Sequence, residues 1–277
     1  MFKTGRAKAR SLCAEIHPAP VDFTEDSYFG SYSKTSIHRT MIKDSIRTRS
    51  YKNAILHNKH LFLGKTVLDV GCGTGILSLF AARAGAKRVI GVDNSNIAYQ
   101  AKRIIMDNNL QDTVLILKGK VEEVELPVKE VDVIISEWMG FCLFYESMLD
   151  SVLFARDKWL APGGLVMPDI VKLQLVGISD DQDKYRDLQY YGQNYQIDLS
   201  ALKELARKEV LVANVDPRKV VTDEFNLKTF NLQTDSKEDI KVDIDFSLTV
   251  KRDSIVNVLV TYFDVFFSHC HREVNSI

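Results

Sequence analysis

The chain has 277 residues, of which 45% are hydrophobic and 26% charged, with a formal net charge of -1. This composition indicates a soluble protein with a sizeable core, and its near-neutral charge excludes a global field for nucleic acid while leaving room for a local patch of either sign. No apolar run approaches the roughly 18 residues of a membrane span. We therefore expect no membrane span and no direct binding of nucleic acid.

The four cysteines are scattered along the chain without a CxxC pair: Cys13, Cys72, Cys142 and Cys270. This spacing argues against a disulfide scaffold and against a zinc site, and it fits a reducing compartment. We expect no bound metal.

Residues 1–27 form a predicted N-terminal tail whose first part is basic and contains no acid, with Lys3, Arg6, Lys8 and Arg10. A solvated flexible tail is the first interpretation, and a transit peptide or basic address is the alternative.

Strand-like and helix-like stretches alternate from Lys65 to Pro168. Because this alternation places each helix between parallel strands, it predicts a doubly wound, mostly parallel α/β sheet. The helix after the second strand should begin with a cap at Asn94 or Ser95. The predicted strands are residues 66–70, 88–93, 114–119, 131–137 and 164–168, and the predicted helices are 75–86, 95–108 and 146–160.

After Pro168 the pattern changes to period-2 alternation, which is typical of antiparallel strands. Strands are expected at 171–178, 242–250 and 254–267, with one helical segment at 199–208. The chain should therefore consist of an α/β domain at 28–168 and a mostly antiparallel β domain at 169–277.

A glycine-rich turn, DVGCGTG, follows the first predicted strand. The dinucleotide spacing GxGxxG is absent because residue 76 is isoleucine, and no Walker pattern is present. What remains is GxGxG plus Asp93 at the end of the second strand, where a carboxylate can accept hydrogen bonds from both hydroxyls of a ribose. A glycine turn without a ligand is the alternative. The candidate cofactor residues in the turn are Asp69, Gly71, Gly73 and Gly75.

Two glutamates, Glu137 and Glu146, flank the apolar and aromatic stretch WMGFCLFY. Either one alone could be a solvated charge, and Glu146 could sit in the first turn of the next helix. Together, in apolar surroundings, they would suit a guanidinium, which stays charged and presents donors in a planar fork. Such carboxylates could hold two nitrogens and leave the target nitrogen better able to attack, so both are candidate catalytic residues.

The stretches VLDVGCGTG and GVD resemble the cofactor motifs of class I methyltransferases, which use S-adenosyl-L-methionine. SEWMGFCLFYESML resembles the double-glutamate loop of the type I protein arginine methyltransferases. Further stretches are similar to the same family, namely YFGSY (28–32), HRTMIKDSIRTRSYKNAI (38–55), KGKVEEVELP (118–127) and ARDKWLAPGG (155–164). The resemblance implies a class I methyltransferase domain with N-terminal lid helices, followed by a β-barrel domain with a helical dimerisation arm at about 180–205.

The resemblance also implies roles for residues that spacing alone does not single out. Arg47 would hold the cofactor's carboxylate, and Val121 with Glu122 would contact the adenine. The remaining implied cofactor residues are Phe29, His38, Met41 and Met148, and the implied substrate-pocket residues are Tyr32, Asp44 and Met148.

The implied activity is methylation of arginine in glycine- and arginine-rich, RNA-binding or histone proteins, giving monomethyl and then asymmetric dimethylarginine. A homodimer in the cytoplasm and nucleus is implied with it. A small-molecule or nucleic-acid methyltransferase is disfavoured, since no Asn/Asp-Pro-Pro-Tyr motif is present. A silent cofactor-binding interaction subunit is the other alternative.

Two departures from the family accompany the resemblance. Asp93 stands where the most similar family members carry a glutamate, so we expect an altered hydrogen bond or a bridging water to the cofactor, and weaker binding. The family's Thr-His-Trp loop, whose histidine would pair with Asp44, is absent from this sequence. An incomplete barrel with an exposed strand edge is the corresponding expectation.

Overall fold

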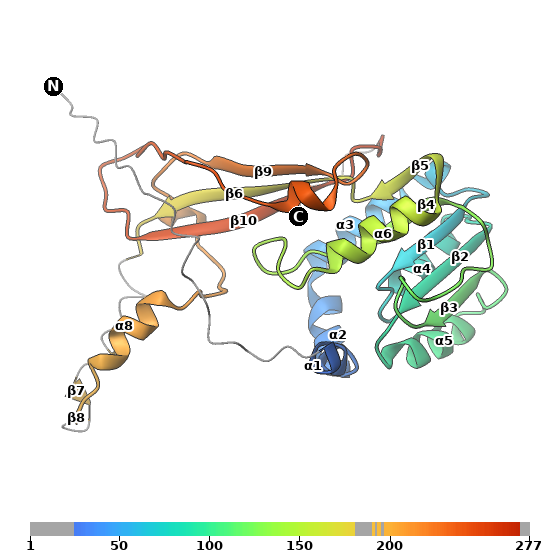
Figure 1. Cartoon of the computed structure of the whole chain (residues 1–277), viewed down its shortest axis with the longest axis horizontal. Helices are drawn as coiled ribbons and strands as arrows, with labels where there is room; N and C mark the ends of the chain where they lie inside the picture. Colours follow the sequence, from blue (N-terminus) through green and yellow to red (C-terminus); the bar gives the residue numbers. More distant parts are fainter. Residues whose placement is uncertain (1–24, 181–189, 192, 195–196, 272–277) are drawn as a thin grey trace. The chain divides into compact units, whose positions relative to one another are not determined.

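The structure is a computed structural model that describes residues 25–180, 190–191, 193–194 and 197–271 (Figure 1). By its contacts the chain divides into two compact units. The larger unit contains the described residues 25–172, 229–240 and 263–271, and the smaller unit contains the rest. The predicted domain boundary at 168–169 remains a prediction.

A five-stranded sheet in the order β3-β2-β1-β4-β5 forms the centre of the larger unit (Figure 1). All four pairings between neighbouring strands are parallel, which confirms the predicted fold class. The strands are β1 (Thr66–Val70), β2 (Arg88–Asp93), β3 (Val114–Lys118), β4 (Val131–Ser136) and β5 (Leu160–Met167).

The strands are buried because their apolar side chains point to both faces of the sheet. In β1, Val67, Leu68 and Val70 are each at most 2% exposed, and β4 contributes Ile134 and Ile135 beside them. A parallel sheet covered on both faces requires this continuous apolar character rather than alternation. The register aligns Asp69 with Gly91 of β2, so the ends of the two strands lie next to each other.

In the part of the chain that the structure describes, helices α1 to α6 and the 3₁₀ helix η1 precede or alternate with the strands of this sheet. In α5, the buried residues Ile97, Ala98, Ala101 and Ile105 recur at helical spacing and form one apolar face. The helices are α1 (Glu25–Tyr32), α2 (Thr35–Lys43), α3 (Ser45–Leu56), η1 (Lys59–Leu61), α4 (Ile76–Arg83), α5 (Ile97–Asp107) and α6 (Met148–Trp159).

The prediction that Asn94 or Ser95 caps α5 is wrong. The N-cap is Asn96, and no side chain makes a capping hydrogen bond there. Ser95 lies one residue before the N-cap, and its hydroxyl donates to Asp93 Oδ1 at 2.6 Å in a charge-assisted bond.

The C-terminal region contains an antiparallel sheet in the order β10-β6-β9. Its strands are β6 (Ile170–Ile178), β9 (Phe225–Asn231) and β10 (Val258–Phe266). The predicted helical segment is α8 (Ala201–Lys208), and the remaining short elements are β7 (Gln193–Asn194), β8 (Ile197–Asp198), η2 (Pro217–Lys219) and η3 (Lys237–Ile240).

The strand predicted at 242–250 is wrong. Val242 to Thr249 form no ladder, and the segment pairs only at its end, through a bridge between Val250 and Thr222. Alternating side chains are not sufficient for a strand, because the backbone also needs a neighbour to bond. Conversely, β9 was missed because its sequence, FNLKTFN, mixes polar residues into the alternation.

Residues from beyond β6 complete the larger unit. The backbone N–H of Leu232 donates to Asp169 O at 2.8 Å, and Ser268 N donates to the buried Asp169 carboxylate at 2.8 Å. Arg156 of α6 donates to Leu232 O at 2.7 Å. Within the described residues, no helix combines the length and apolar character needed to cross a membrane.

Leu68 lies at the centre of the sheet and is 0% exposed. Leu68→Ala should lower the free energy of unfolding by about 2–5 kcal/mol, because it removes apolar contacts and leaves a cavity. Both tryptophans, Trp138 and Trp159, belong to the larger unit, so tryptophan fluorescence during urea unfolding measures it. Leu115→Ala on β3, where the side chain is 42% exposed, is the control and should lower stability by about 1 kcal/mol or less. An equal loss in both variants would contradict this burial pattern.

Candidate functional site

A cavity of about 920 Å³ lies at the carboxyl ends of the sheet strands. Because β2 and β4 pair with opposite edges of β1, this is the point where the strand order reverses, and open α/β sheets bind ligands there. The predicted site residues that line the cavity are Phe29, Tyr32, His38, Met41, Arg47, Gly71, Gly73, Asp93, Val121, Glu122, Glu137, Glu146 and Met148. Those that do not line it are Asp44, Asp69 and Gly75.

The glycine turn brings backbone rather than side chains to the cavity wall. Gly71, Gly73 and Gly75 have φ angles of 69°, 53° and 78°, a region that favours glycine. A Cβ on Gly71 would lie 2.0 Å from Met148 Cε, so a side chain there would displace the end of Met148 as well as strain the backbone. Gly75 directly precedes α4, and it therefore shapes the turn without lining the cavity.

Asp69 lies behind this turn, where it is 0% exposed. Its Oδ2 accepts a hydrogen bond of 2.6 Å from Ser78 in α4, and its Oδ1 has no hydrogen-bond partner among the described residues. Burial raises the pKa of Asp69 from 3.8 to about 7, against the lowering effect of the Ser78 bonds. Asp69 thus ties β1 to α4 and positions the turn between them.

Asp93 ends β2 and bonds to the turn from the other side. Its Oδ2 accepts from Gly73 N at 2.8 Å, while its Oδ1 accepts from the backbone and hydroxyl of Ser95. A carboxylate has about four lone-pair sites, so it can still accept from a ribose hydroxyl. The shorter aspartate is therefore already bonded to the loop, while its altered hydrogen bond to the cofactor stays a prediction.

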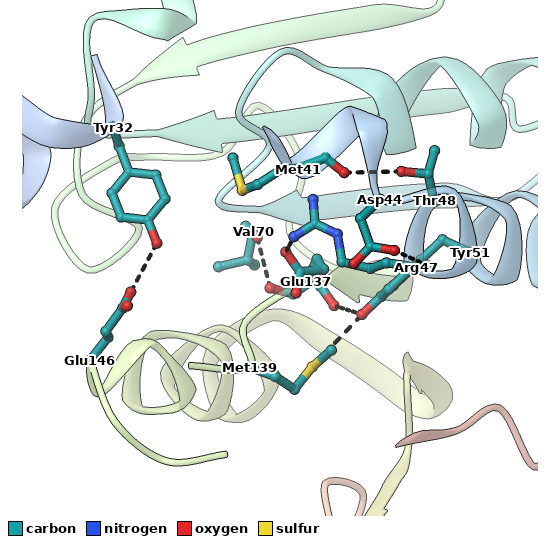
Figure 2. A network of polar contacts seen from close by, with 11 residues as sticks. Tyr32, Met41, Asp44, Arg47, Thr48, Tyr51, Val70, Glu137, Met139 and Glu146 are labelled. Atoms are coloured by element: carbon teal, nitrogen blue, oxygen red, sulfur yellow. Dashed lines mark hydrogen bonds and ion pairs between the residues drawn. The ribbon is translucent and has the colours of Figure 1, made fainter. Parts of the chain in front are cut away.

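An ion pair joins Arg47 of α3 to Glu137 at the end of β4 (Figure 2). Arg47 Nη1 donates to Glu137 Oε2 at 2.5 Å, and the two side chains are 23% and 20% exposed. Arg47 lies in the first turn of α3, where the N-cap Asp44 Oδ1 accepts from Arg47 N at 3.1 Å. Asp44 is exposed and serves α3 as an N-cap.

Buried groups fix the end of β4 that carries Glu137. The Tyr51 hydroxyl donates to Ser136 O at 3.0 Å, and the Ser136 hydroxyl donates to Val70 O of β1 at 2.8 Å (Figure 2). Burial raises the pKa of Glu137, Arg47 lowers it, and the charges of Asp44 and Glu146 raise it. Glu137 is therefore a carboxylate whose ionised form depends on a cationic partner.

Unlike Glu137, which directly follows a strand, Glu146 lies in an irregular loop between β4 and α6. Four non-glycine residues of this loop have positive φ: Cys142, Leu143, Glu146 and Ser147. Such conformations cost about 1–3 kcal/mol each and persist where surrounding packing enforces them. Leu143 is 0% exposed and anchors the loop, while a Cβ on Gly140 would lie 1.9 Å from Tyr145 O.

The N-terminal helices contact this loop through Tyr32. Its hydroxyl donates to Glu146 Oε2 at 2.9 Å (Figure 2), and His38 Nε2 donates to Tyr32 O at 2.7 Å. At the other end of the cavity, the Ser151 hydroxyl donates to Glu122 Oε1 at 2.6 Å. The predicted lid residues and the predicted adenine-side residues thus line one cavity.

The residues that line the cavity match the chemical groups of S-adenosylmethionine. Asp93 offers acceptors for a ribose, buried Val121 and the flexible Met148 offer apolar surface for a purine, and Arg47 keeps guanidinium N–H groups beyond the one used by Glu137. The glycine turn admits a ligand close to the backbone. The roles assigned to these residues remain predictions.

Comparison with family models divides the chain at a similar place. Residues 67–164 match a model described as a methyltransferase domain, and residues 169–276 match one described as the arginine methyltransferase oligomerization subdomain. Protein arginine N-methyltransferase 1 of Chlamydomonas reinhardtii is 50% identical over 250 residues, which cover 90% of this chain and 72% of that protein. The chain belongs to the protein arginine N-methyltransferase family.

Other members of the family agree with this assignment. Protein arginine N-methyltransferase 8-B of Danio rerio is 48% identical over 269 residues, covering 97% of this chain and 63% of that protein. The chain spans 63% to 73% of the length of the curated relatives it matches.

Solved structures of arginine methyltransferases show the same fold. The Trypanosoma brucei PRMT1 enzyme-prozyme heterotetrameric complex with AdoHcy matches with a TM-score of 0.83 at 44% identity, covering 87% of this chain and 76% of that chain. Protein arginine methyltransferase 10 of Arabidopsis thaliana matches with a TM-score of 0.74 at 32% identity, covering 86% and 74%. The function of the chain as an arginine methyltransferase is S-adenosylmethionine-dependent methylation of arginine, and its C-terminal region serves oligomerisation.

Sequence reasoning about this arginine methyltransferase missed several cavity residues. Tyr51, Trp138 and Tyr145 line the cavity, and Tyr51 also holds the end of β4. Trp138 and Tyr145 lie inside the quoted double-glutamate stretch, so their neighbourhood was marked. Tyr51 lies inside the quoted stretch 38–55, but it was not singled out because one tyrosine in a helix is most often core.

The titration of Asp69 should appear in the stability of the enzyme. Because its folded pKa of about 7 lies above the ordinary 3.8, its contribution to stability is full below about pH 4 and is lost as the pH rises to about 7. Asp69→Asn keeps an acceptor for Ser78 but does not ionise. Relative to the parent, the variant should gain on the order of 4 kcal/mol between these pH values.

Urea unfolding at several pH values, followed by tryptophan fluorescence, measures the stability difference. Asp107→Asn, an exposed carboxyl of α5, is the matched control and should run parallel to the parent. A pH-independent difference for Asp69→Asn would show that Asp69 does not titrate in this range.

Proposed function

We propose that Glu137 and Glu146 together hold the guanidinium of a substrate arginine and make one of its nitrogens the methyl acceptor. The observation that carries this proposal is the contact of Glu137 with the Arg47 guanidinium at 2.5 Å. The partly buried carboxylate already binds the chemical group that the substrate would present. Glu146 lines the same cavity from the far end of the loop that follows β4, and we place a second guanidinium between the two carboxylates.

The two carboxylates change the charge distribution of the substrate guanidinium and fix its position. Hydrogen bonds to two nitrogens concentrate positive charge there and leave the third nitrogen richer in electrons, while also fixing its direction. The cofactor supplies the methyl group as a sulfonium when bound. The methylated guanidinium loses one proton, and the carboxylates of Glu137 and Glu146 are the acceptors within the cavity. Burial raises the pKa of Glu137 and so favours proton uptake there.

Methylation proceeds to asymmetric dimethylarginine in this proposal. Met41 and Tyr32 line the cavity together, and this pair is the type I arrangement of the family resemblance. The Tyr32 contact with Glu146 places the pair at the acceptor side.

Proteins with glycine- and arginine-rich segments, RNA-binding proteins and histones are the proposed substrates. The cavity supports a cationic substrate, because its lining includes five carboxylates: Asp93, Glu122, Glu123, Glu137 and Glu146. Such substrates would be met in the cytoplasm and nucleus.

Oligomerisation takes the form of a homodimer in this proposal, with residues 180–205 as the arm. Much of that arm lies outside the described residues. Its described end, α8, exposes Leu202 and Leu205 at 42% and 61%, which is apolar surface suited to burial against a second copy.

Replacing a pocket carboxylate should remove methyl transfer without removing cofactor binding. Glu146→Gln keeps the size of the side chain and its acceptor oxygen, but loses the charge that holds a guanidinium. We expect kcat for a glycine-arginine peptide to fall at least about a hundredfold, measured with labelled S-adenosylmethionine. Cofactor affinity, measured by calorimetry, should change little.

Glu125→Gln, an exposed neighbour outside the cavity, is the control and should keep full activity. A peptide with lysine in place of arginine should stay unlabelled, and mass spectrometry of the product should show asymmetric dimethylarginine. Cofactor binding without any transfer by the parent protein would identify a silent subunit instead.

Introducing negative charge on α8 should dissociate the proposed dimer. Leu202→Glu with Leu205→Glu places two like charges where the proposed interface is apolar, so sedimentation should show the mass of one chain rather than two. Ile255→Glu, 69% exposed and outside α8, should keep the parent's mass. A dimer that survives the α8 pair would place the interface elsewhere.

A further inference from the structure

The tyrosine that contacts the end of β4 is itself held by a residue outside the active-site cavity. Tyr51 of α3 lines the cavity and is 2% exposed. Its ring packs edge-to-face against Phe267, with the ring centroids 5.1 Å apart and the ring planes at 84°. Phe267 directly follows β10 and does not line the cavity. The position of Tyr51 therefore depends on a residue that lies far from α3 along the chain.

The residues from Phe267 to His271 lie along the second half of α3 and the turn that follows it. Cys270 Sγ donates to Ala54 O of α3 at 3.6 Å. His271 N donates to Oδ1 of the buried Asn58 at 3.0 Å, just beyond the end of α3. We call residues 267–271 the brace of α3.

The brace is fixed at both ends. Ser268 N donates to the carboxylate of Asp169 at 2.8 Å, and the Ser268 hydroxyl donates to the same buried carboxylate. At the other end, the ring of His271 stacks on that of His60, with the centroids 4.7 Å apart. All of these residues belong to the larger unit, together with the cavity. The brace is thus part of the same compact body as the active site.

The hydroxyl of Tyr51 lies on the acceptor side of the cavity (Figure 2). It donates to Ser136 O at 3.0 Å, and Met139 Sδ lies 3.8 Å from the same oxygen. Burial raises the pKa of Tyr51 well above its usual value of 10.0, and the charge of Glu137 adds to this effect. The hydroxyl therefore keeps the one proton that it donates. Its two contacts lie on either side of Glu137 in the sequence.

Glu137 lies where the backbone leaves the sheet. Ser136 is the last residue of β4, and residues 137–139 belong to no strand or helix. Their direction consequently depends on side-chain contacts more than on a ladder of backbone bonds. A misplacement of about 1 Å at a reacting group can slow a reaction by a factor of about a hundred. A small movement of Tyr51 would therefore be felt at the carboxylate.

We propose that Tyr51 and Phe267 are positioning residues for methyl transfer, with the brace fixing the Tyr51 ring and the Tyr51 hydroxyl fixing the segment that carries Glu137. The proposal rests on the proposed function in taking Glu137 to hold the substrate guanidinium. It makes the chain that follows β10 a part of the acceptor side, although that chain does not line the cavity.

Removing the hydroxyl alone tests the proposal on catalysis. Tyr51→Phe keeps the ring against Phe267 but loses the donor to Ser136 O, so kcat for a glycine-arginine peptide should fall about tenfold. Cofactor affinity, measured by calorimetry, should stay within about twofold. The binding stoichiometry gives the folded fraction, so that kcat is expressed per folded enzyme. Tyr99→Phe, an exposed tyrosine of α5 outside the cavity, is the control and should keep the parent's kcat.

A double-mutant cycle separates positioning of Glu137 from a general effect of packing. In a Glu137→Gln enzyme, Tyr51→Phe should cost less than about threefold in kcat, because no carboxylate is left to position. Labelled S-adenosylmethionine at high enzyme concentration measures the low rates. An equal loss in both backgrounds would overturn the proposal, as would a parent-like kcat per folded Tyr51→Phe enzyme.

Phe267→Leu tests the brace from its other end. It keeps the Tyr51 hydroxyl and an apolar neighbour but removes the ring contact, so kcat should fall about threefold. Because the two residues act in series, Phe267→Leu should add little to Tyr51→Phe. Phe246→Leu, which loses an aromatic pair with Phe225 in the smaller unit, is the control and should keep the parent's kcat. Fully additive losses would show that Phe267 does not act through Tyr51.

Trp138 reports on the same segment without catalysis. It directly follows Glu137 and is 3% exposed, and the chain's second tryptophan is Trp159. In a Trp159→Phe protein, Tyr51→Phe and Phe267→Leu should each raise acrylamide quenching of Trp138 about twofold, because a loosened segment admits the quencher. Tyr99→Phe should not. A parent protein without methyl transfer would contradict the proposed function, while unchanged quenching in both variants would overturn the positioning role by itself.

Discussion

The ion pair between Arg47 and Glu137 is the interaction on which the rest of the site depends. A carboxylate with 20% exposure at the end of a buried strand is costly unless a cation faces it, and Arg47 supplies that cation from α3. The pair therefore connects the sheet to the N-terminal helices with one charged contact. The family resemblance also assigns Arg47 to the cofactor's carboxylate. One guanidinium can serve both partners, since it carries five N–H donors, and the filling of the cofactor site is then coupled to the carboxylate that faces the acceptor.

The two glutamates are held by opposite kinds of structure. Glu137 follows a regular strand whose last residue is bonded through Ser136 to Val70 and Tyr51, so its backbone is fixed by the sheet. Glu146 itself has a φ of 81°, in a loop anchored by buried Leu143, and its carboxylate is contacted from α1 by Tyr32. Movement of the N-terminal helices would consequently displace Glu146 more than Glu137. The geometry of the pair is set when α1 lies over the cavity, which makes the lid part of the acceptor site.

Most of the methyltransferase fold could be predicted because its strands are buried on both faces and its turns contain glycine. The strand at 66–70, the turn at 71–75 and the paired glutamates follow from local pattern and chemistry. Other features depend on contacts between distant residues. Ser95 was expected to cap a helix, but the helix begins one residue later than expected, and the Ser95 hydroxyl is directed to Asp93. The segment 242–250 alternates like a strand yet lacks a neighbour along most of its length. Asp69 was assigned to the cofactor from its place in the motif, whereas its burial and its bond to Ser78 depend on the packing of α4.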